Sequence, residues 1–276
     1  MGYQAEASAV GALALGAQAF SRGGNATALG AGTRAIGVGS SAFGYGSWAT
    51  GAGSISIGGE ANGTNPGDTG PNVNSTNAAA ADAIAIGSQA RVNATTSTSG
   101  IAIGRGANVN GAYGIAQGDG VVSGAIGQNV AIGSGNTTAN SSTAAGGAVA
   151  IGRGQTATGN GAVAIGDPNT ATGTGAIALG ADNTANGQGA LAQGNLNNAT
   201  GQGALALGNG NTANGQGAVA LGNASSASVA GAVALGDGAS ASVARSVALG
   251  SGSTTAAAVG TASTVIRGTT YNFAGT

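Results

Sequence analysis

Few side chains in this sequence could take part in acid–base or nucleophilic chemistry, and those are scattered. All seven basic residues are arginines, and the chain contains no lysine, histidine or cysteine. It therefore cannot supply a Schiff-base or phosphate-binding lysine, a cysteine nucleophile or a Ser-His-Asp triad. The usual ligands of a zinc site and the makings of a disulfide framework are missing too. We therefore expect that the protein is not an enzyme. We also expect that it has no catalytic, cofactor-binding or metal-binding residues and needs no cofactor.

The charge distribution argues against two further classes of partner. Eight acidic and seven basic residues are dispersed singly and leave a net charge of −1. Nucleic acids and anionic membranes attract clustered positive charge, so we predict neither nucleic-acid binding nor membrane contact. No apolar run approaches the roughly 18 residues of a membrane span, and the N-terminus lacks the pattern of a signal peptide. We expect the chain to be a segment of a longer protein.

One six-residue phrase dominates the chain: a small residue, then Ala, aliphatic, Ala, aliphatic and Gly. In the C-terminal half it ends every 14 residues, at Gly152, Gly166, Gly180, Gly194, Gly208, Gly222, Gly236 and Gly250. Weaker copies end at Gly16, Gly30, Gly44 and Gly58, and at Gly87, Gly104, Gly118 and Gly133 with stretched intervals. Sixteen units of nearly fixed period predict a solenoid.

Each unit has the pattern of a coil with two short strands. Aliphatic residues two apart, such as Val163 and Ile165, alternate with Ala as in a β-strand. The other half of the unit, as in Thr170-Ala171-Thr172, predicts a second strand with Ala turned inward and Thr outward. Gly, Asn and Asp between the strands suit tight turns. The predicted fold is an all-β parallel solenoid, and sixteen coils at about 4.8 Å each make a rod roughly 80 Å long.

We predict that the aliphatic residues stack inside the coils and that the alternating Ala residues form a smooth outer face. Small residues allow close approach, so the alanine face is predicted to pack against other chains in an obligate oligomer. The predicted core ladder is Val149, Ile151, Val163, Ile165, Ile177, Leu179, Leu205, Leu207, Val219, Leu221, Val233 and Leu235. The predicted chain–chain face includes Ala148, Ala150, Ala162, Ala164, Ala176 and Ala178.

Two amides interrupt the aliphatic positions. Gln117 and Gln193 replace an isoleucine or leucine, so we expect their side chains to point into the roll. A buried amide needs partners, which would be backbone groups, a trapped water or an internal ligand.

The phrase Gly-Ala-Val-Ala-Ile-Gly in 14-residue coils resembles the head repeats of trimeric autotransporter adhesins, the YadA-like head. The resemblance covers about residues 7–253. It implies a left-handed parallel β-roll, a homotrimer, and a bacterial surface location with anchoring in the outer membrane through further C-terminal regions. It also implies attachment to a host extracellular-matrix protein or cell-surface receptor, and cell–cell aggregation. The family phrase commonly opens with Asn-Ser, whereas here Gly-Ala is usual, so no ligand contact of that Asn is carried over.

The spacing divides the chain into four parts. Residues 1–58 are predicted as N-terminal coils, 59–86 as a coil with an inserted loop, 87–253 as further coils, and 254–276 as a short β-element. The last part looks like the element that precedes the neck in some family members. Its Tyr271 and Phe273 are expected to pack as a cap.

Two places are candidates for recognition. The interval from Gly58 to Gly87 exceeds one coil by 15 residues, and the insert holds Pro66, Asp68 and Pro71. Loops that project from a rigid scaffold often carry recognition, although a tolerated surface insertion has the same pattern. Trp48 and Tyr45 lie in an aromatic cluster, which is either a hydrophobic hot spot or a filler of irregular packing.

A polar column of the second strand offers an alternative function. Thr156, Thr170, Thr184, Asn198, Thr212, Ser226 and Ser240 recur at 14-residue spacing and resemble the hydroxyl arrays of ice-binding solenoids. The leading prediction is a non-enzymatic adhesive head. A phage or other trimeric fibre segment and an ice-binding β-solenoid are the alternatives.

Overall fold

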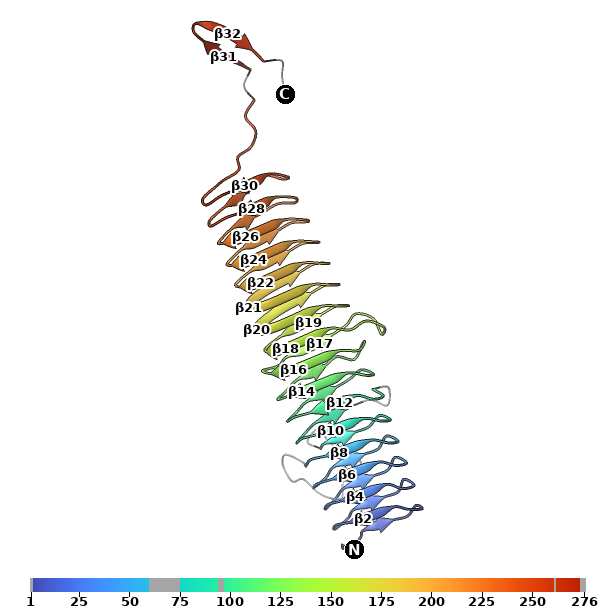
Figure 1. The fold of residues 1–276 in the computed structure, drawn as a ribbon. Helices are drawn as coiled ribbons and strands as arrows, with labels where there is room; N and C mark the ends of the chain where they lie inside the picture. The colour runs from blue at the N-terminus through green and yellow to red at the C-terminus, as the bar shows by residue number, and fades with distance from the viewer. Residues whose placement is uncertain (1, 60–74, 94–96, 261, 274–276) are drawn as a thin grey trace.

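The computed structural model describes residues 2–59, 75–93, 97–260 and 262–273. Within this part the chain winds into stacked two-stranded coils that form one elongated rod, from β1 at one end to β30 at the other (Figure 1). The described residues contain strands and turns and no helix. The predicted parallel solenoid of about sixteen 14-residue coils is confirmed.

Each coil contributes a first strand, built from the repeated apolar phrase, to one side of the rod. These strands are β2 (Leu13–Leu15), β4 (Thr27–Leu29), β6 (Ser41–Phe43), β8 (Ile55–Ile57), β10 (Ile84–Ile86), β12 (Ile101–Ile103), β14 (Ile115–Gly118), β16 (Val130–Ser134), β18 (Val149–Arg153), β22 (Leu191–Asn195), β24 (Leu205–Asn209), β26 (Val219–Asn223), β28 (Val233–Leu235) and β30 (Val247–Leu249).

The second strand of each coil lies on the opposite side. These strands are β1 (Glu6–Ala7), β3 (Phe20–Ser21), β5 (Arg34–Ala35), β7 (Trp48–Ala49), β9 (Asn77–Ala78), β11 (Arg91–Val92), β13 (Asn108–Val109), β15 (Val122–Ser123), β17 (Thr138–Asn140), β19 (Thr156–Thr158), β23 (Asn198–Thr200), β25 (Thr212–Asn214), β27 (Ser226–Ala227) and β29 (Ser240–Ala241). Two longer strands, β20 (Val163–Thr172) and β21 (Ile177–Asn186), run through both halves of their coils.

The strands pair in parallel with the equivalent strands of the neighbouring coils, in the register of the repeat. Val163 in β20 is opposite Val149 on one side and Ile177 on the other. Thr170 is likewise opposite Thr156 and Thr184. Equivalent residues therefore form straight columns along the rod, and each column has its own chemistry.

Alanine fills the interior of the coils. Ala150 in the first strand β18, Ala157 in the second strand β19 and Ala148 in the preceding turn are all 0% exposed, and other coils repeat this arrangement. The two strands of one coil are joined by tight turns, and small side chains fill most of the space between them, with larger ones such as Val92 and Val109 in a few coils. The core is therefore a narrow seam of small side chains.

Close stacking of the coils explains the glycine that ends each phrase. A Cβ at Gly208 would lie 2.0 Å from the carbonyl oxygen of Gly222 in the next coil. Gly208 also has a φ of +124°, which L side chains rarely adopt. Both the turn and the stacking thus require glycine at this position.

A separate hairpin follows the rod. Strands β31 (Ser263–Ile266) and β32 (Thr269–Asn272) pair with each other in antiparallel fashion and contact no strand of the rod (Figure 1). Tyr271 and Phe273 are exposed on this hairpin, so the expectation that they cap the rod is wrong for the single chain. The extended residues after β30 carry them away from the last coil.

Candidate interaction faces

The outward side chains of the first strands form what we call the aliphatic face, which runs from Leu13 to Leu249. In β18, Val149 and Ile151 flank the buried Ala150 and are themselves only partly covered. Exposure is 54% at Leu13 and 72% at Leu249 near the rod ends, and 37% at Ile165 in the middle. A monomeric protein rarely exposes so long an apolar surface. This face is the strongest candidate for contact between chains.

This arrangement corrects the predicted core and the predicted chain–chain face, because the two sides of the first strand are reversed. None of Val149, Ile151, Val163, Ile165, Ile177, Leu179, Leu205, Leu207, Val219, Leu221, Val233 and Leu235 is buried. The predicted contact residues Ala148, Ala150, Ala162, Ala164, Ala176 and Ala178 are each 0% exposed inside the coil. The physical reason is that Ala side chains from both strands already fill the interior of these coils, which leaves the larger aliphatic residues on the outside.

Gln117 and Gln193 share this reversal. Gln117 is opposite Ile103 and Ile132, and Gln193 is opposite Leu179 and Leu207. Both glutamine side chains are exposed, so the expectation that they point into the roll is wrong. They are polar interruptions of the aliphatic face.

A column of buried asparagines lines the interior corner before the second strand, and we call it the asparagine ladder: Asn169, Asn183, Asn197 and Asn211. The Nδ2 of Asn183 donates to the Oδ1 of Asn169 at 3.0 Å, to the carbonyl of Leu179 at 3.0 Å and to that of Gly194 at 2.8 Å. The Asn183 backbone N–H donates to the same Oδ1 at 3.0 Å. The amide therefore has its donors and acceptor satisfied although it is almost fully buried.

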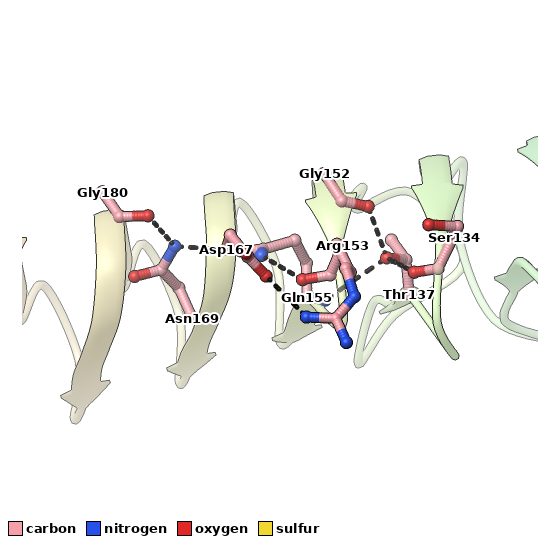
Figure 2. A network of polar contacts seen from close by, with 8 residues as sticks. All are labelled: Ser134, Thr137, Gly152, Arg153, Gln155, Asp167, Asn169 and Gly180. Carbon is pink, nitrogen blue, oxygen red and sulfur yellow. Dashed lines mark hydrogen bonds and ion pairs between the residues drawn. The ribbon is translucent and has the colours of Figure 1, made fainter.

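Other polar residues close the ladder at both ends. Figure 2 shows Asn169 donating to the side chain of Gln155 at 3.1 Å, while Gln155 donates to the carbonyl of Arg153 at 2.8 Å. The backbone N–H of Gln155 in turn reaches the hydroxyl of Thr137 at 3.3 Å. At the other end, the Ser225 hydroxyl donates to Asn211 at 2.6 Å. The asparagine ladder was missed from the sequence, although its strict 14-residue recurrence was visible there.

The second strands from β19 onward present a face without charge, which we call the hydroxyl face. It consists of two columns of outward side chains. The first column is Thr156, Thr170, Thr184, Asn198, Thr212, Ser226 and Ser240. The second column lies two residues later in each coil and is Thr158, Thr172, Asn186, Thr200, Asn214, Ser228 and Ser242. The Ala between them, such as Ala171, is 0% exposed. The predicted inward Ala and outward Thr of the second strand are therefore confirmed.

Some charged side chains form ion pairs between neighbouring coils at the rod's surface. Arg105 contacts Asp119 at 2.6 Å, and Arg153 contacts Asp167 at 3.4 Å (Figure 2). Arg22 donates two hydrogen bonds to Glu6, which lower the pKa of the Glu6 carboxyl and raise that of the guanidinium. These pairs are exposed to solvent, so each contributes little to the stability of the fold.

An aromatic stack occupies the second strands near the N-terminus. The Arg34 guanidinium carbon lies 4.7 Å from the ring centroids of both Phe20 and Trp48, a double cation–π contact. Trp48 is only 5% exposed, so the prediction that it presents a recognition surface is wrong, and it acts as packing. Tyr45 is half-buried and stays a candidate. Pro66, Asp68 and Pro71 lie outside the described residues.

The described residues contain no group of three or more His, Cys, Asp or Glu side chains that could hold a metal ion. They also contain no helix long and apolar enough to cross a membrane.

Comparison with known proteins identifies the repeat. The family model of the YadA head domain repeat matches residues 1–19, 7–33, 35–61, 157–183, 171–197, 185–211, 199–225, 213–239 and 230–253. A search of curated proteins found no match. The matched segments cover more than half of the chain and follow the coils described above. The chain therefore belongs to the YadA head repeat family and is a YadA-like head domain of a trimeric autotransporter adhesin.

Proposed function

We propose that this head forms a homotrimeric rod on the bacterial surface that attaches to host extracellular-matrix proteins or cells and promotes aggregation between bacteria. The observation that carries the proposal is the aliphatic face, which a single chain leaves partly exposed from Leu13 to Leu249 and most exposed near the rod ends. Family membership adds the expectation of three chains and of anchoring in the outer membrane through other regions of the protein.

In the proposed trimer, three aliphatic faces meet around the rod axis. Each partly exposed Val, Ile or Leu would gain on the order of 1 kcal/mol from being covered, and the columns extend through all coils. Left-handed winding belongs to this proposal as well. The same packing keeps the three hydroxyl faces outside, so a binding surface is presented three times.

Threefold display on a stiff rod suits adhesion. Once one site has bound, the others are held near the target at a high effective concentration, so strong attachment needs no strong single contact. The insert with Pro66, Asp68 and Pro71, together with the half-buried Tyr45, is proposed as the place that contacts the host target.

The test combines oligomeric state with adhesion. The purified chain is first examined by sedimentation equilibrium and then applied to surfaces coated with collagen, fibronectin, laminin or albumin, and to cultured cells. We expect a trimer that binds at least one matrix protein or the cells, but not albumin. A stable monomer, or no binding to any of these targets, would show the proposal to be wrong.

A variant lacking residues 60–74, which keeps the buried Ser75 and Thr76 and strand β9, separates the head's function from the role of the insert. Loss of binding with an unchanged trimer supports recognition by the insert. Unchanged binding shows that another part of the rod makes the contact, while leaving the adhesive function in place.

A further inference from the structure

The hydroxyl face has the properties of a surface for one particular kind of partner. We propose that it binds the ordered hydrogen-bonding lattice of ice, so that the head can attach its cell to ice crystals as well as to a host. The proposal goes beyond attachment to host molecules and needs only that the second-strand side of the rod faces solvent.

The first argument is the regularity of the face. Thr170 and Thr172 point outward from one strand, about 7 Å apart, and their counterparts in the next coil follow at about 4.8 Å. Parallel pairing without a register shift continues the same grid from β19 to β29. The side chains are all short, so the grid has a nearly uniform height. Such a surface repeats in two directions, as a crystal lattice does.

The second argument is that most of these groups are available. The hydroxyls of Thr156, Thr170, Thr184 and Thr212 make no hydrogen bond within the described part of the protein. The Thr200 hydroxyl, which donates to Asn198 at 2.7 Å, and Ser242, which contacts Thr255, are exceptions. Each free hydroxyl offers one donor and two acceptor positions, one donor fewer than a water molecule.

The third argument is rigidity. Asn169 and Asn183 of the asparagine ladder directly precede Thr170 and Thr184, and their side chains donate to backbone carbonyls of their own coil and of the following coil. Ala171, between the two columns, is fully buried. The ladder therefore fixes the strand that carries the hydroxyls before any partner arrives. A surface ordered in advance loses little conformational entropy on binding.

The fourth argument excludes other partners. The face has no charge, which sulfated glycans, acidic peptides and lipid headgroups would require. Residues 149–253 contain no aromatic side chain on which a sugar ring could stack. Each hydroxyl contact exchanges one hydrogen bond to water for another and is individually weak. Only a partner with its own repeating order can engage many such positions at once.

The experiment measures partition into ice. The purified chain and albumin are mixed, and a single ice crystal is grown slowly from the solution while the protein fraction in the ice is measured. Crystal shape and thermal hysteresis are recorded in parallel. We expect the chain, but not albumin, to be enriched in the ice. Partition at the level of albumin would overturn the proposal, even if adhesion to host targets is found.

Matched variants assign the effect to this face. Thr170→Tyr with Thr184→Tyr places two bulky rings in the middle of the grid, whereas Thr174→Tyr places one ring on an exposed turn between the same strands. We expect the double variant to lose ice partition and T174Y to keep it, with sedimentation confirming that both retain the wild-type assembly. Retention by the double variant would overturn the assignment.

A final arm distinguishes ice from other ordered hydroxyl surfaces. Sedimentation with microcrystalline cellulose or chitin is measured for the same proteins. Binding to these polymers without partition into ice would replace our proposal with a polysaccharide partner. Loss of host adhesion in the variant lacking residues 60–74, without loss of ice partition, would show that the two activities use different parts of the rod.

Discussion

The side-chain oxygen of Asn169 accepts two hydrogen bonds from Asn183, one from its backbone N–H and one from its side-chain amide, both at 3.0 Å. The same pair of bonds joins Asn197 to Asn183 and Asn211 to Asn197. Each amide therefore links its own coil to both neighbours, in an interior otherwise filled by methyl groups. The asparagine ladder contributes directed bonds where alanine contributes only burial.

Removing one amide should therefore disturb two junctions between coils. Asn183→Ala removes the acceptor of the Asn197 backbone N–H and one of the three acceptors of the Asn197 side-chain amide. It also removes one donor to each of the carbonyls of Leu179 and Gly194. We expect the free energy of unfolding to fall by about 3 kcal/mol, since buried unsatisfied groups are costly. Thr184→Ala, on the outer side of the same coil, should change it by less than about 0.5 kcal/mol. Equal guanidinium midpoints for the two variants would contradict the role of the ladder.

Replacing the amide by an acid should make stability depend on pH. In Asn183→Asp, an ionised carboxylate cannot donate to the carbonyls of Leu179 and Gly194, and burial raises its pKa above the unfolded value of about 3.9. The neutral form is favoured in the folded state, so the loss of stability should be small below that value and grow as pH rises toward 7. Denaturant midpoints measured across this range test the trend. Asn186→Asp, at an exposed site in the same coil, should lack it.

The second strand could be predicted correctly because its two sides differ in polarity. Ala171 is apolar and its neighbours Thr170 and Thr172 are polar, so alternation alone indicates which side is buried. In the first strand both sides are apolar, and alternation of Val163, Ala164 and Ile165 does not indicate which side faces inward. The folded coil decides, because Ala side chains from both strands fill its interior together. The pattern therefore identifies the strand but not its inner side.

The asparagine ladder could not be predicted from the sequence for a different reason. Asn at 169, 183, 197 and 211 recurs without exception, yet asparagine between strands is typical of exposed turns. Its burial depends on the coil offering carbonyls of its own and of the following coil at hydrogen-bond distance, as those of Ile165 and Gly180 are for Asn169. Only the stacked structure brings these groups together.

The aliphatic face makes a clear prediction about assembly. In the proposed trimer, Ile165→Asp would place three unpaired carboxylates near the axis, and we expect the trimer to weaken by about 3–5 kcal/mol. Thr170→Asp introduces the same charge on the opposite side of β20 and should leave the assembly unchanged. Sedimentation velocity at increasing urea concentration measures both. If the two variants dissociate at the same urea concentration, the aliphatic face is not the interface between chains.

Two glycines close together in one turn should respond differently to an added methyl group. At Gly208 the new Cβ would meet the carbonyl of Gly222 at 2.0 Å, whereas at Gly210 no heavy atom lies within 4 Å. Gly210→Ala should lower the free energy of unfolding by about 1 kcal/mol through its positive φ of +64° alone. Gly208→Ala must in addition push two coils apart and should cost clearly more. Thermal unfolding of both variants checks this order, which identical midpoints would refute.

The pKa of Glu6 in the first coil should depend on its contact with Arg22. Arg22 Nε and Nη2 each lie 3.0 Å from a Glu6 oxygen, and these bonds lower the pKa of the Glu6 carboxyl. The pair therefore stabilises the fold above the unfolded glutamate pKa of about 4.3 and loses its effect as pH falls through the lowered folded value. Carbon-13 labelling of glutamate should resolve this in an NMR titration, because the chain has two glutamates and Glu6→Gln assigns the signal. In Arg22→Gln the pKa of Glu6 should return toward its ordinary value, while in Arg105→Gln it should stay low. An ordinary pKa in the wild type would mean that the pair does not form in solution.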